Sequence, residues 1–523
     1  MDDHDTTGKK TSGTNISFWI DSTPMRTGVK LDRDINTDVL VIGGGIAGLT
    51  TAYLLLKTGK KVTLVEDGFL ASGESGRTTA HLTAALDDRY YFIENVFGQS
   101  AAALAAESHT SAIAEIGRIV QSEQIDCHFK KVSGYLFLDP TDKPSHLEKE
   151  FDATQRAGLN TQFLESVPAM AGGEQMKCVE FVGQAQFHIT KYLNGLADAI
   201  LSLGGNIFTQ TRAEEISSKG AKANGFEIKA QHIVVATNTP VNDWVTMHTK
   251  QHPYRTYVIG GKIKKGSLPY ALWWDTGNAD SKWVSQPYHY VRLESYDENY
   301  DLLISGGEDH KTGQAESEDI PEEQRYERLE QWTRAHFPEM EDVVYRWSGQ
   351  VMEPVDSLGY MGKNPGDDNI YIITGDSGNG MTHTTIGAMI IRDLIIGEKN
   401  RWADLYDPSR ITFKTADDFV METANMAAQY LDWVTPADLK DAESLQPGQG
   451  GIVTSGLKKI AVYKDEHGEL QKYTAVCPHL GCIVRWNGDE KTFDCPCHGS
   501  RFTCQGEVIN GPAMTGLAPL REK

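Results

Sequence analysis

The sequence contains no run of eighteen apolar residues, so we expect no transmembrane helix. It is also short of basic residues. The 72 Asp and Glu residues outnumber the 50 Lys and Arg residues, which gives a formal net charge of −22. This charge argues against nucleic acid as a partner, because a phosphate backbone is bound by a basic face. The N-terminal stretch MDDHDTTGKKTSGTN lacks the apolar segment of a signal peptide. We therefore expect a cytoplasmic protein, with residues 1–16 disordered.

Cysteine is scarce over most of the chain. Only Cys127 and Cys178 precede residue 477, and we interpret both as unpaired thiols. The other five cysteines crowd between Cys477 and Cys504. In a chain without a signal peptide, such clustering favours a metal site over a disulfide scaffold. A length of 523 residues exceeds what one core can organise and suggests roughly three domain-sized units.

Residues 38–66, DVLVIGGGIAGLTTAYLLLKTGKKVTLVE, predict a compact β-α-β unit. A β-branched run at 39–42 is typical of a buried parallel strand, and apolar residues at helical spacing follow it. Gly43, Gly45 and Gly48 fit G-x-G-x-x-G, in which backbone N–H groups at a helix start bind a pyrophosphate. Glu66 ends the second strand, where an acid binds ribose hydroxyls. We therefore predict a dinucleotide site rather than a merely structural glycine turn.

Three further stretches join this motif in a family resemblance. They are FLASGESGRTTAHLTAAL at 69–86, HIVVATNTP at 232–240 and NIYIITGDSGNGMTHTTIGAM at 369–389. Together they resemble the FAD-dependent oxidoreductases of the D-amino-acid oxidase and glycine oxidase (DAO) type, over about residues 17–410. The resemblance implies a Rossmann-type α/β domain that binds FAD, interleaved with a mixed-sheet substrate domain. The FAD-binding segments would be about 36–100, 184–243 and 350–410, and the substrate-domain segments about 125–183 and 244–349.

The resemblance also implies which residues contact FAD. The glycine turn would hold the pyrophosphate, the backbone near Ala213 would meet the adenine, and a helix starting near Met381 would stabilise negative charge on the reduced ring. Noncovalent binding is favoured over a covalent bond to His81, because this histidine is displaced from the linking position in relatives. The full set of implied contacts is Gly43, Gly45, Ile46, Ala47, Gly48, Glu66, Asp67, Ser75, Gly76, Arg77, Thr78, Thr79, His81, Leu82, Ala213, Thr237, Gly375, Asp376, Gly378, Asn379, Gly380 and Met381.

The excursion from about 244 to 350 is rich in aromatic residues, and its alternating stretches predict antiparallel strands that roof the flavin. We expect most of these rings to be core residues and a few to line the pocket. By resemblance, the small-molecule substrate is an amine, N-alkyl amine or amino acid, oxidised to an imine that hydrolyses. Candidates for orienting a substrate carboxylate are Arg255 and Arg292, with Tyr257, Tyr288 and Tyr290 as hydroxyl partners. A structural role for either arginine remains the alternative.

A helical connector is predicted at 411–440, and short strands separated by turns then predict a small all-β domain at 441–523. Its loops AVCPHLGC at 475–482 and DCPCHGS at 494–500 resemble those of Rieske iron–sulfur proteins. The resemblance implies a [2Fe–2S] cluster with thiolates on one iron and imidazoles on the other, and a disulfide between Cys482 and Cys497. A zinc site with mixed Cys and His ligands is the alternative. The implied cluster ligands are Cys477, His479, Cys495 and His498.

Two neighbouring residues bear on the cluster potential. Ser500 matches the serine whose hydroxyl bonds a cluster sulfur in high-potential relatives, whereas Phe502 replaces a tyrosine. We predict a potential below that of respiratory Rieske proteins and above that of ferredoxins without the disulfide. Residues 511–513, Gly-Pro-Ala, match the loop that covers the cluster, and Cys504 is expected to be an ordinary thiol.

A two-electron flavin and a one-electron cluster on one chain predict a dehydrogenase. The substrate would reduce FAD, FAD would reduce the cluster, and the cluster would reduce an external protein or quinone. Three alternatives remain: an oxygen-using amine oxidase with a structural or redox-sensing Rieske domain, a reductase or monooxygenase component fed through the cluster, and a non-catalytic redox-responsive module. The sequence shows no second glycine motif for NAD(P) and no facial triad for mononuclear iron, which argues against an oxygenase. The sequence is also compatible with a homo-oligomer.

Overall fold

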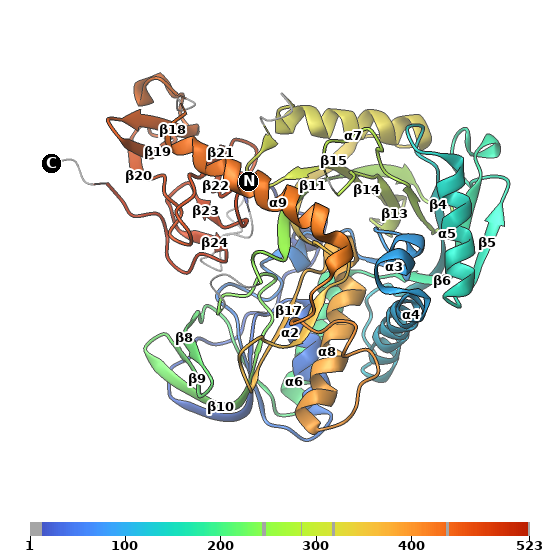
Figure 1. The fold of residues 1–523 in the computed structure, drawn as a ribbon, viewed down its shortest axis with the longest axis horizontal. Coiled ribbons are helices and arrows are strands. Elements are labelled where there is room, and N and C mark those ends of the chain that lie inside the picture. Colours follow the sequence, from blue (N-terminus) through green and yellow to red (C-terminus); the bar gives the residue numbers. More distant parts are fainter. Residues whose placement is uncertain (1–12, 243–246, 284, 316–319, 436–438, 521–523) are drawn as a thin grey trace.

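The computed structural model describes residues 13–242, 247–283, 285–315, 320–435 and 439–520, without the side chains of 413 and 416–419. Two large sheets lie side by side, and a small all-β domain lies beside them (Figure 1). Within the described residues, no helix has the length and apolarity that crossing a bilayer requires.

The first sheet has the predicted parallel nucleotide-binding core, with antiparallel strands at its edges. Its central strand β1 (Ile35–Ile42) pairs in parallel with β10 (Phe226–Val235) on one side and with β2 (Val62–Val65) on the other. The strand order is β16-β17-β10-β1-β2-β7. From β1 the chain first adds strands on one side, β2 and β7, and later on the other side, β10, β17 and β16. Such a change of side leaves a binding crevice at the carboxyl ends of the strands. The outer strands are β7 (Asn206–Phe208), β8 (Ala213–Ser217), β9 (Gly220–Ala223), β16 (Tyr360–Lys363) and β17 (Ile370–Thr374).

Helix α2 (Ile46–Leu56) follows β1 directly. Every one of its residues is buried, as expected for a helix that is apolar on all sides. Helices α6 (Ile189–Ser202) and α8 (Gly380–Ile396) pack against it. The other helices of this part are α1 (Phe18–Ser22), α3 (Tyr90–Phe97) and α4 (Gln99–Ser122).

The second sheet has nine strands in the order β15-β11-β14-β13-β12-β4-β6-β3, with β5 paired to β6. Strands β13 and β14 are antiparallel, which confirms the prediction made from the alternating pattern of this segment. Helix α7 (Glu322–His336) packs on β11 and β14, and α5 (Pro144–Arg156) packs on β5 and β6. The strands are β3 (His81–Leu82), β4 (Lys130–Phe137), β5 (Thr161–Leu164), β6 (Cys178–Gln186), β11 (Gln251–Lys264), β12 (Leu272–Asp275), β13 (Tyr290–Ser295), β14 (Tyr300–Lys311) and β15 (Val343–Pro354).

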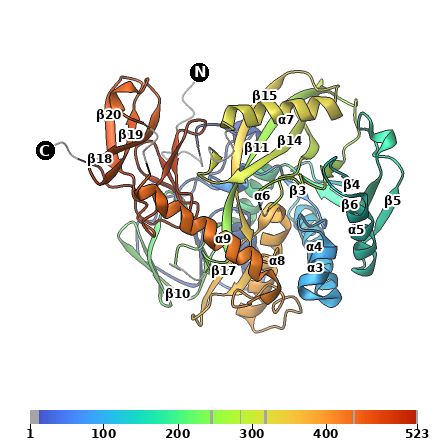
Figure 2. The ribbon, with the colours of Figure 1, turned by 45° about the horizontal axis from the view of Figure 1, so that its top comes forward.

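The C-terminal domain consists of one three-stranded and one four-stranded antiparallel sheet. Helix α9 (Ala416–Ala428) and the short helix η6 (Gln429–Trp433) connect it to the rest of the chain, and α9 crosses from the first sheet to this domain (Figure 2). The strands are β18 (Gly450–Ser455), β19 (Lys458–Lys464), β20 (Leu470–Thr474), β21 (Arg485–Asn487), β22 (Thr492–Asp494), β23 (Arg501–Thr503) and β24 (Val508–Asn510).

The N-terminal prediction requires a correction. Residues 1–12 of the segment predicted to be disordered lie outside the described residues. Within its last part, Thr14 Oγ1 donates to the Glu490 carbonyl at 2.9 Å, and Asn15 Nδ2 donates to Asp489 Oδ2 at 2.9 Å. The prediction of disorder is therefore wrong for this part, because partners nearly 480 positions away in the sequence hold it.

Candidate functional site

A cavity of about 280 Å³ follows the carboxyl ends of the nucleotide-binding strands and extends beneath the second sheet. Most of the residues predicted to contact FAD line it. The exceptions are Gly48, Gly76, Leu82 and Gly375. Glycine at position 48 is instead required for packing, because a Cβ there would lie 1.9 Å from the Gly43 carbonyl oxygen.

One end of the cavity suits a dinucleotide. Gly43 has φ of 112°, a value that favours glycine, and a Cβ there would meet the Ala236 carbonyl oxygen at 2.3 Å. Glu66 lies at the end of β2, where its Oε2 accepts a hydrogen bond from the Gly44 amide at 2.6 Å. Burial, reinforced by Asp67, raises the pKa of Glu66 to about 7. The helix start and this fixed acid provide the groups that a pyrophosphate and a ribose need.

At the other end the cavity lies between the start of α8 and the second sheet. Tyr290 and Thr256 join their hydroxyl groups at 2.6 Å, and Tyr288 and Asp87 also line this end. The His81 ring lies 3.0 Å from Thr79 Oγ1 through Nδ1. Burial, together with Arg292, lowers the pKa of His81 to about 3, so this ring is neutral at physiological pH.

The four predicted cluster ligands come together in the C-terminal domain. Cys477 and Cys495 are hydrogen bonded to each other, which lowers the pKa of the Cys477 thiol. The rings of His479 and His498 lie 4.9 Å apart. All four side chains are buried. Two thiols and two imidazoles in this arrangement fit a Rieske cluster.

The two ligand loops are built alike. Gly481 donates its amide to the Cys477 carbonyl at 3.0 Å, and Gly499 donates to the Cys495 carbonyl at 3.1 Å. Both glycines have positive φ, near 80° and 76°, which allows the tight turn after each ligand.

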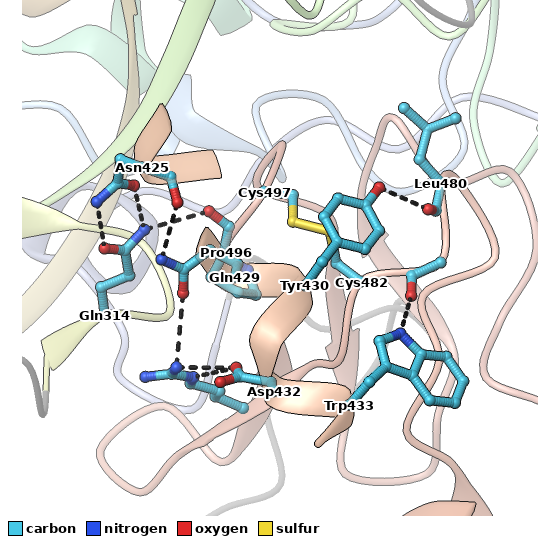
Figure 3. The surroundings of a disulfide bond; sticks show 12 residues. Gln314, Asn425, Gln429, Tyr430, Asp432, Trp433, Leu480, Cys482, Pro496 and Cys497 are labelled. Atoms are coloured by element: carbon cyan, nitrogen blue, oxygen red, sulfur yellow. Dashed lines mark hydrogen bonds and ion pairs between the residues drawn. A yellow bond between two sulfur atoms is a disulfide. The ribbon is translucent and has the colours of Figure 1, made fainter. Parts of the chain in front are cut away.

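A disulfide between Cys482 and Cys497 joins the loops, as predicted (Figure 3). These two sulfurs and Cys495 Sγ form the only group of three metal-ligand atoms within 4.8 Å of one another in the described residues. A disulfide leaves its sulfurs unavailable as thiolates, so this group of three is compatible with the predicted ligand set, which stays a prediction. Two side chains of η6 cap the neighbouring loop: Tyr430 donates to the Leu480 carbonyl at 2.8 Å, and Trp433 donates to the Gly481 carbonyl at 3.1 Å (Figure 3).

Comparison with known proteins agrees with both sites. Residues 38–394 match the family "DAO: FAD dependent oxidoreductase". The chain belongs to this family. Residues 435–521 match the Rieske [2Fe-2S] domain, so the DAO domain binds FAD and the C-terminal domain binds a [2Fe–2S] cluster. The resemblances stated from the sequence are thereby confirmed, as are the fold class and the assignment as a flavin oxidoreductase.

Individual relatives show the same two-part organisation or the larger part alone. YhfW of Bacillus subtilis (strain 168), whose name describes a Rieske 2Fe-2S iron-sulfur protein, is 31% identical over 509 residues, covering 96% of each chain. Gamma-glutamylputrescine oxidoreductase of Escherichia coli (strain K12) is 26% identical over 393 residues, which are 71% of this chain and 86% of that one. The crystal structure of L-proline dehydrogenase from P. horikoshii shares the fold, with a TM-score of 0.58 and 18% identity over 72% of this chain and 98% of that one.

The two arginines predicted to orient a substrate carboxylate do not line the flavin cavity. Arg292 donates to the carbonyl oxygens of Ala80 at 2.8 Å and Phe187 at 3.0 Å, and it forms an ion pair with Glu294. Its spacing of two from Glu294 places both on one face of β13, and this signal was available in the sequence. The guanidinium group is therefore committed to the protein.

Arg255 requires the same correction. It donates to Ser348 Oγ at 2.6 Å and forms an ion pair with Glu490 of the Rieske domain at 3.1 Å. Tyr257 is also a core residue, with its hydroxyl 3.0 Å from His310 Nε2. Among the described residues, the cavity lining includes Tyr288 and Tyr290 but none of Arg255, Arg292 and Tyr257.

The Rieske domain completes the flavin cavity, and sequence reasoning missed this. Six of its residues, from 508–511 and 513–514, contribute to the lining, including part of the Gly-Pro-Ala loop. Asn510 Nδ2 donates to Glu74 Oε1 at 3.1 Å, and Gln350 Nε2 donates to the Gly499 carbonyl at 3.1 Å. No local pattern could have predicted these contacts, because they join residues far apart in the sequence.

The cluster ligands face the flavin domain. His479 is 7% exposed and His498 is 3% exposed. The ring of His248, from the flavin domain, lies 5.0 Å from that of His479 and 6.1 Å from that of His498. Burial lowers the pKa of His498 to about 3, which favours the neutral imidazole that binds metal.

Proposed function

We propose that this protein is an amine dehydrogenase in which electrons leave the flavin through the Rieske cluster of the same polypeptide. The observation that supports it is the shared cavity: the loop that packs beside the cluster also lines the flavin site. The imidazole ligands are buried against the flavin domain. Both features favour transfer within one chain over transfer between separate proteins.

The overall reaction is a two-electron oxidation. FAD, when bound, accepts a hydride from the carbon next to the substrate nitrogen, and the nitrogen lone pair forms the C=N bond. Water then hydrolyses this imine to a carbonyl compound, with release of ammonia from a primary amine or of the other amine from an N-alkyl amine. The two electrons reach two equivalents of a one-electron acceptor, because a [2Fe–2S] cluster transfers one at a time. The acceptor is an external protein or quinone.

The side chains beside the flavin end suit this chemistry. No strong base is required when the amine enters deprotonated, so orientation is the main task. Tyr288 is hydrogen bonded to Asp87, and Tyr290 is held by Thr256. His81 is neutral and therefore does not repel a cationic product. The name of the gamma-glutamylputrescine relative also supports an amine substrate.

Anaerobic reduction of the purified holoprotein tests the proposal. Titration with dithionite should consume three electrons per chain, two at the flavin and one at the cluster. In a separate, fully oxidised sample, an amine substrate should bleach the flavin absorbance and produce the EPR signal of a reduced Rieske cluster within one turnover. In air, product should exceed hydrogen peroxide when a one-electron acceptor is present.

Two results would contradict the proposal. Equal amounts of peroxide and product with an EPR-silent cluster would indicate an oxidase. Bleaching of the flavin by a reductant that enters only through the cluster, with no response to any amine, would indicate the opposite direction of electron flow.

A further inference from the structure

A second cavity, of about 340 Å³, adjoins the flavin cavity. Four residues line both: Asp87, Ser285, Tyr288 and Glu353. They lie at the end where α8 begins, which is where the resemblance places the reactive ring of the flavin. The two cavities therefore share a boundary at this end.

The lining of the second cavity is acidic. Its carboxylates belong to Asp87, Asp88, Asp142, Glu150, Glu353 and Glu422. Two of them have side-chain partners at the cavity or next to it. Asp142 lies 2.6 Å from His146 Nδ1, and Glu422 forms an ion pair with Lys311.

The other four carboxylates face a single basic group. Arg89 is the one arginine or lysine in the described lining, and its guanidinium group donates to the carbonyl oxygens of Leu86 and Asp275, each at 3.1 Å. Glu353 accepts from Ser377 Oγ at 2.7 Å, which is a neutral donor. The cavity therefore presents more carboxyl groups than basic groups. Burial raises the pKa values of Asp87, Asp88 and Glu353, so a cation bound beside them would favour their ionised forms.

Glu150 points to a missing ligand. It is 1% exposed, its Oε2 accepts from the Tyr91 amide at 3.2 Å, and its Oε1 has no hydrogen-bond partner within the described part of the chain. Leaving a buried carboxylate oxygen unpaired is unfavourable, because the oxygen has lost its water and gained no hydrogen bond. Burial raises the pKa of Glu150 to about 7, and a cation bound beside it would favour the ionised form.

The geometry favours an organic cation over a metal ion. In the described residues, no three carboxylates bring their oxygens within 4.8 Å of one another, as a metal ion would require. A protonated amine needs no such convergence, because its three N–H donors can bond to acceptors spread around a cavity. A substrate carboxylate is disfavoured here, since Arg255 and Arg292 are committed elsewhere.

We propose that the second cavity binds a distal ammonium group, so that the preferred substrate is a diamine or polyamine oxidised at its other nitrogen. This inference rests on the proposed amine dehydrogenase function. It adds a binding site for the end of the substrate that does not react. Glu150 and Asp88 are assigned as the main acceptors because they line this cavity and not the flavin cavity.

Binding is measured first, independently of turnover. Isothermal titration calorimetry of the anaerobic holoprotein, with its flavin and cluster first reduced by dithionite so that no amine can be oxidised, compares putrescine, the four-carbon diamine, with pentylamine, which has the same number of heavy atoms. We expect putrescine to bind at least tenfold more tightly. Glu150→Gln should abolish this difference and leave pentylamine unchanged. Glu148→Gln, an exposed carboxylate on the same helix, is the matched control and should behave as the parent. Asp88→Asn, at a less buried position, serves if Glu150→Gln fails to fold.

Steady-state kinetics then separates the inference from the function on which it rests. With a one-electron acceptor, Glu150→Gln should raise KM for putrescine about tenfold with little change in kcat. Equal binding of the two amines by the parent protein, or an unchanged putrescine affinity in both Glu150→Gln and Asp88→Asn, would overturn the inference. If putrescine binds selectively and no amine bleaches the flavin, the binding site stands and the dehydrogenase function fails.

Discussion

Arg77 of the flavin domain and Glu490 of the Rieske domain form an ion pair at 3.0 Å, and neither side chain is exposed. Arg255 contacts the same carboxylate oxygen at 3.1 Å, and Ser348 also donates to it. Burial opposes the charge on Glu490, but Arg77 and Arg255 outweigh it and hold the pKa of Glu490 below its ordinary value. Two guanidinium groups from one domain thus share one carboxylate from the other.

Replacing Glu490 should therefore loosen the docking of the two domains. In Glu490→Gln the two buried arginines lose the carboxylate that they share, and breaking such a pair costs about 3–5 kcal/mol. We expect faster proteolysis of the connector at 411–440 and slower reduction of the cluster by the flavin, while anaerobic bleaching of the flavin by substrate persists. Limited proteolysis and stopped-flow absorbance measure these effects.

Glu443→Gln provides the control, because Glu443 is an exposed carboxylate of the same domain. It should leave both measurements unchanged. A Glu490→Gln variant with parental proteolysis and parental cluster reduction would show that the pair does not hold the domains together.

His289 should make stability depend on pH on the alkaline side. Its Nδ1 lies 2.8 Å from Asp275 Oδ2, and its Nε2 lies 3.6 Å from Glu308 Oε1. Burial favours the neutral ring, yet the two carboxylates outweigh it and raise the pKa of His289 to about 9. The unfolded value is about 6.5, so the charged ring stabilises the fold fully below that pH and loses this contribution as pH rises through about 9.

The expected loss is on the order of 3 kcal/mol of unfolding free energy between about pH 6.5 and 9. Denaturant unfolding of the holoprotein across this range measures it. His289→Asn cannot become charged, so its stability should be lower at pH 6.5 and should fall less than that of the parent protein over the same window. An equal slope in both proteins would refute the role of His289.

Local sequence patterns predicted the nucleotide end of the site well. The strand, the glycine turn and α2 are consecutive in the chain, so residues 38–66 determine most of their own geometry. The cluster ligands could be predicted from the sequence equally well, because each Cys and His pair lies within a loop of a few residues. Their spacing fixes the chemistry before any tertiary contact forms.

The roles of the arginines could not be predicted in the same way. Arg255 is paired with Glu490, 235 positions later, and this contact exists only once the Rieske domain has docked. In the sequence, an arginine within an aromatic segment is equally compatible with binding a substrate and with forming a contact between two domains. The acidic second cavity was missed for a related reason: Asp88, Glu150 and Glu353 come from three distant segments, and only the fold brings them together.

Gly48→Ala should abolish FAD binding. A Cβ at this position would lie 1.9 Å from the Gly43 carbonyl oxygen, so α2 would have to move away from the turn that binds the pyrophosphate. We expect the purified variant to retain less than about a tenth of the parental flavin, as a loss of at least 1.4 kcal/mol in binding implies. Flavin absorbance relative to iron content measures this loss, because the Rieske domain should keep its cluster.

Gly73→Ala is the matched control. Gly73 also lines the cavity, but a Cβ there meets no atom within 4 Å. It should retain flavin at the parental level. Full flavin occupancy in Gly48→Ala would mean that the helix can shift without harm to the site.

Ser500→Ala should lower the reduction potential of the cluster. Ser500 Oγ accepts a hydrogen bond from the Ala513 amide at 3.0 Å and is also hydrogen bonded to the Cys477 thiol. Because the amide is its donor, the hydroxyl proton is directed to the sulfur, and such a bond stabilises the reduced, more negative cluster. Losing a bond of about 1 kcal/mol lowers a one-electron potential by about 40 mV. Redox titration followed by EPR measures the shift. Ser500→Thr, which keeps the hydroxyl, should restore most of it, whereas a potential unchanged in Ser500→Ala would show that the hydroxyl does not reach the cluster.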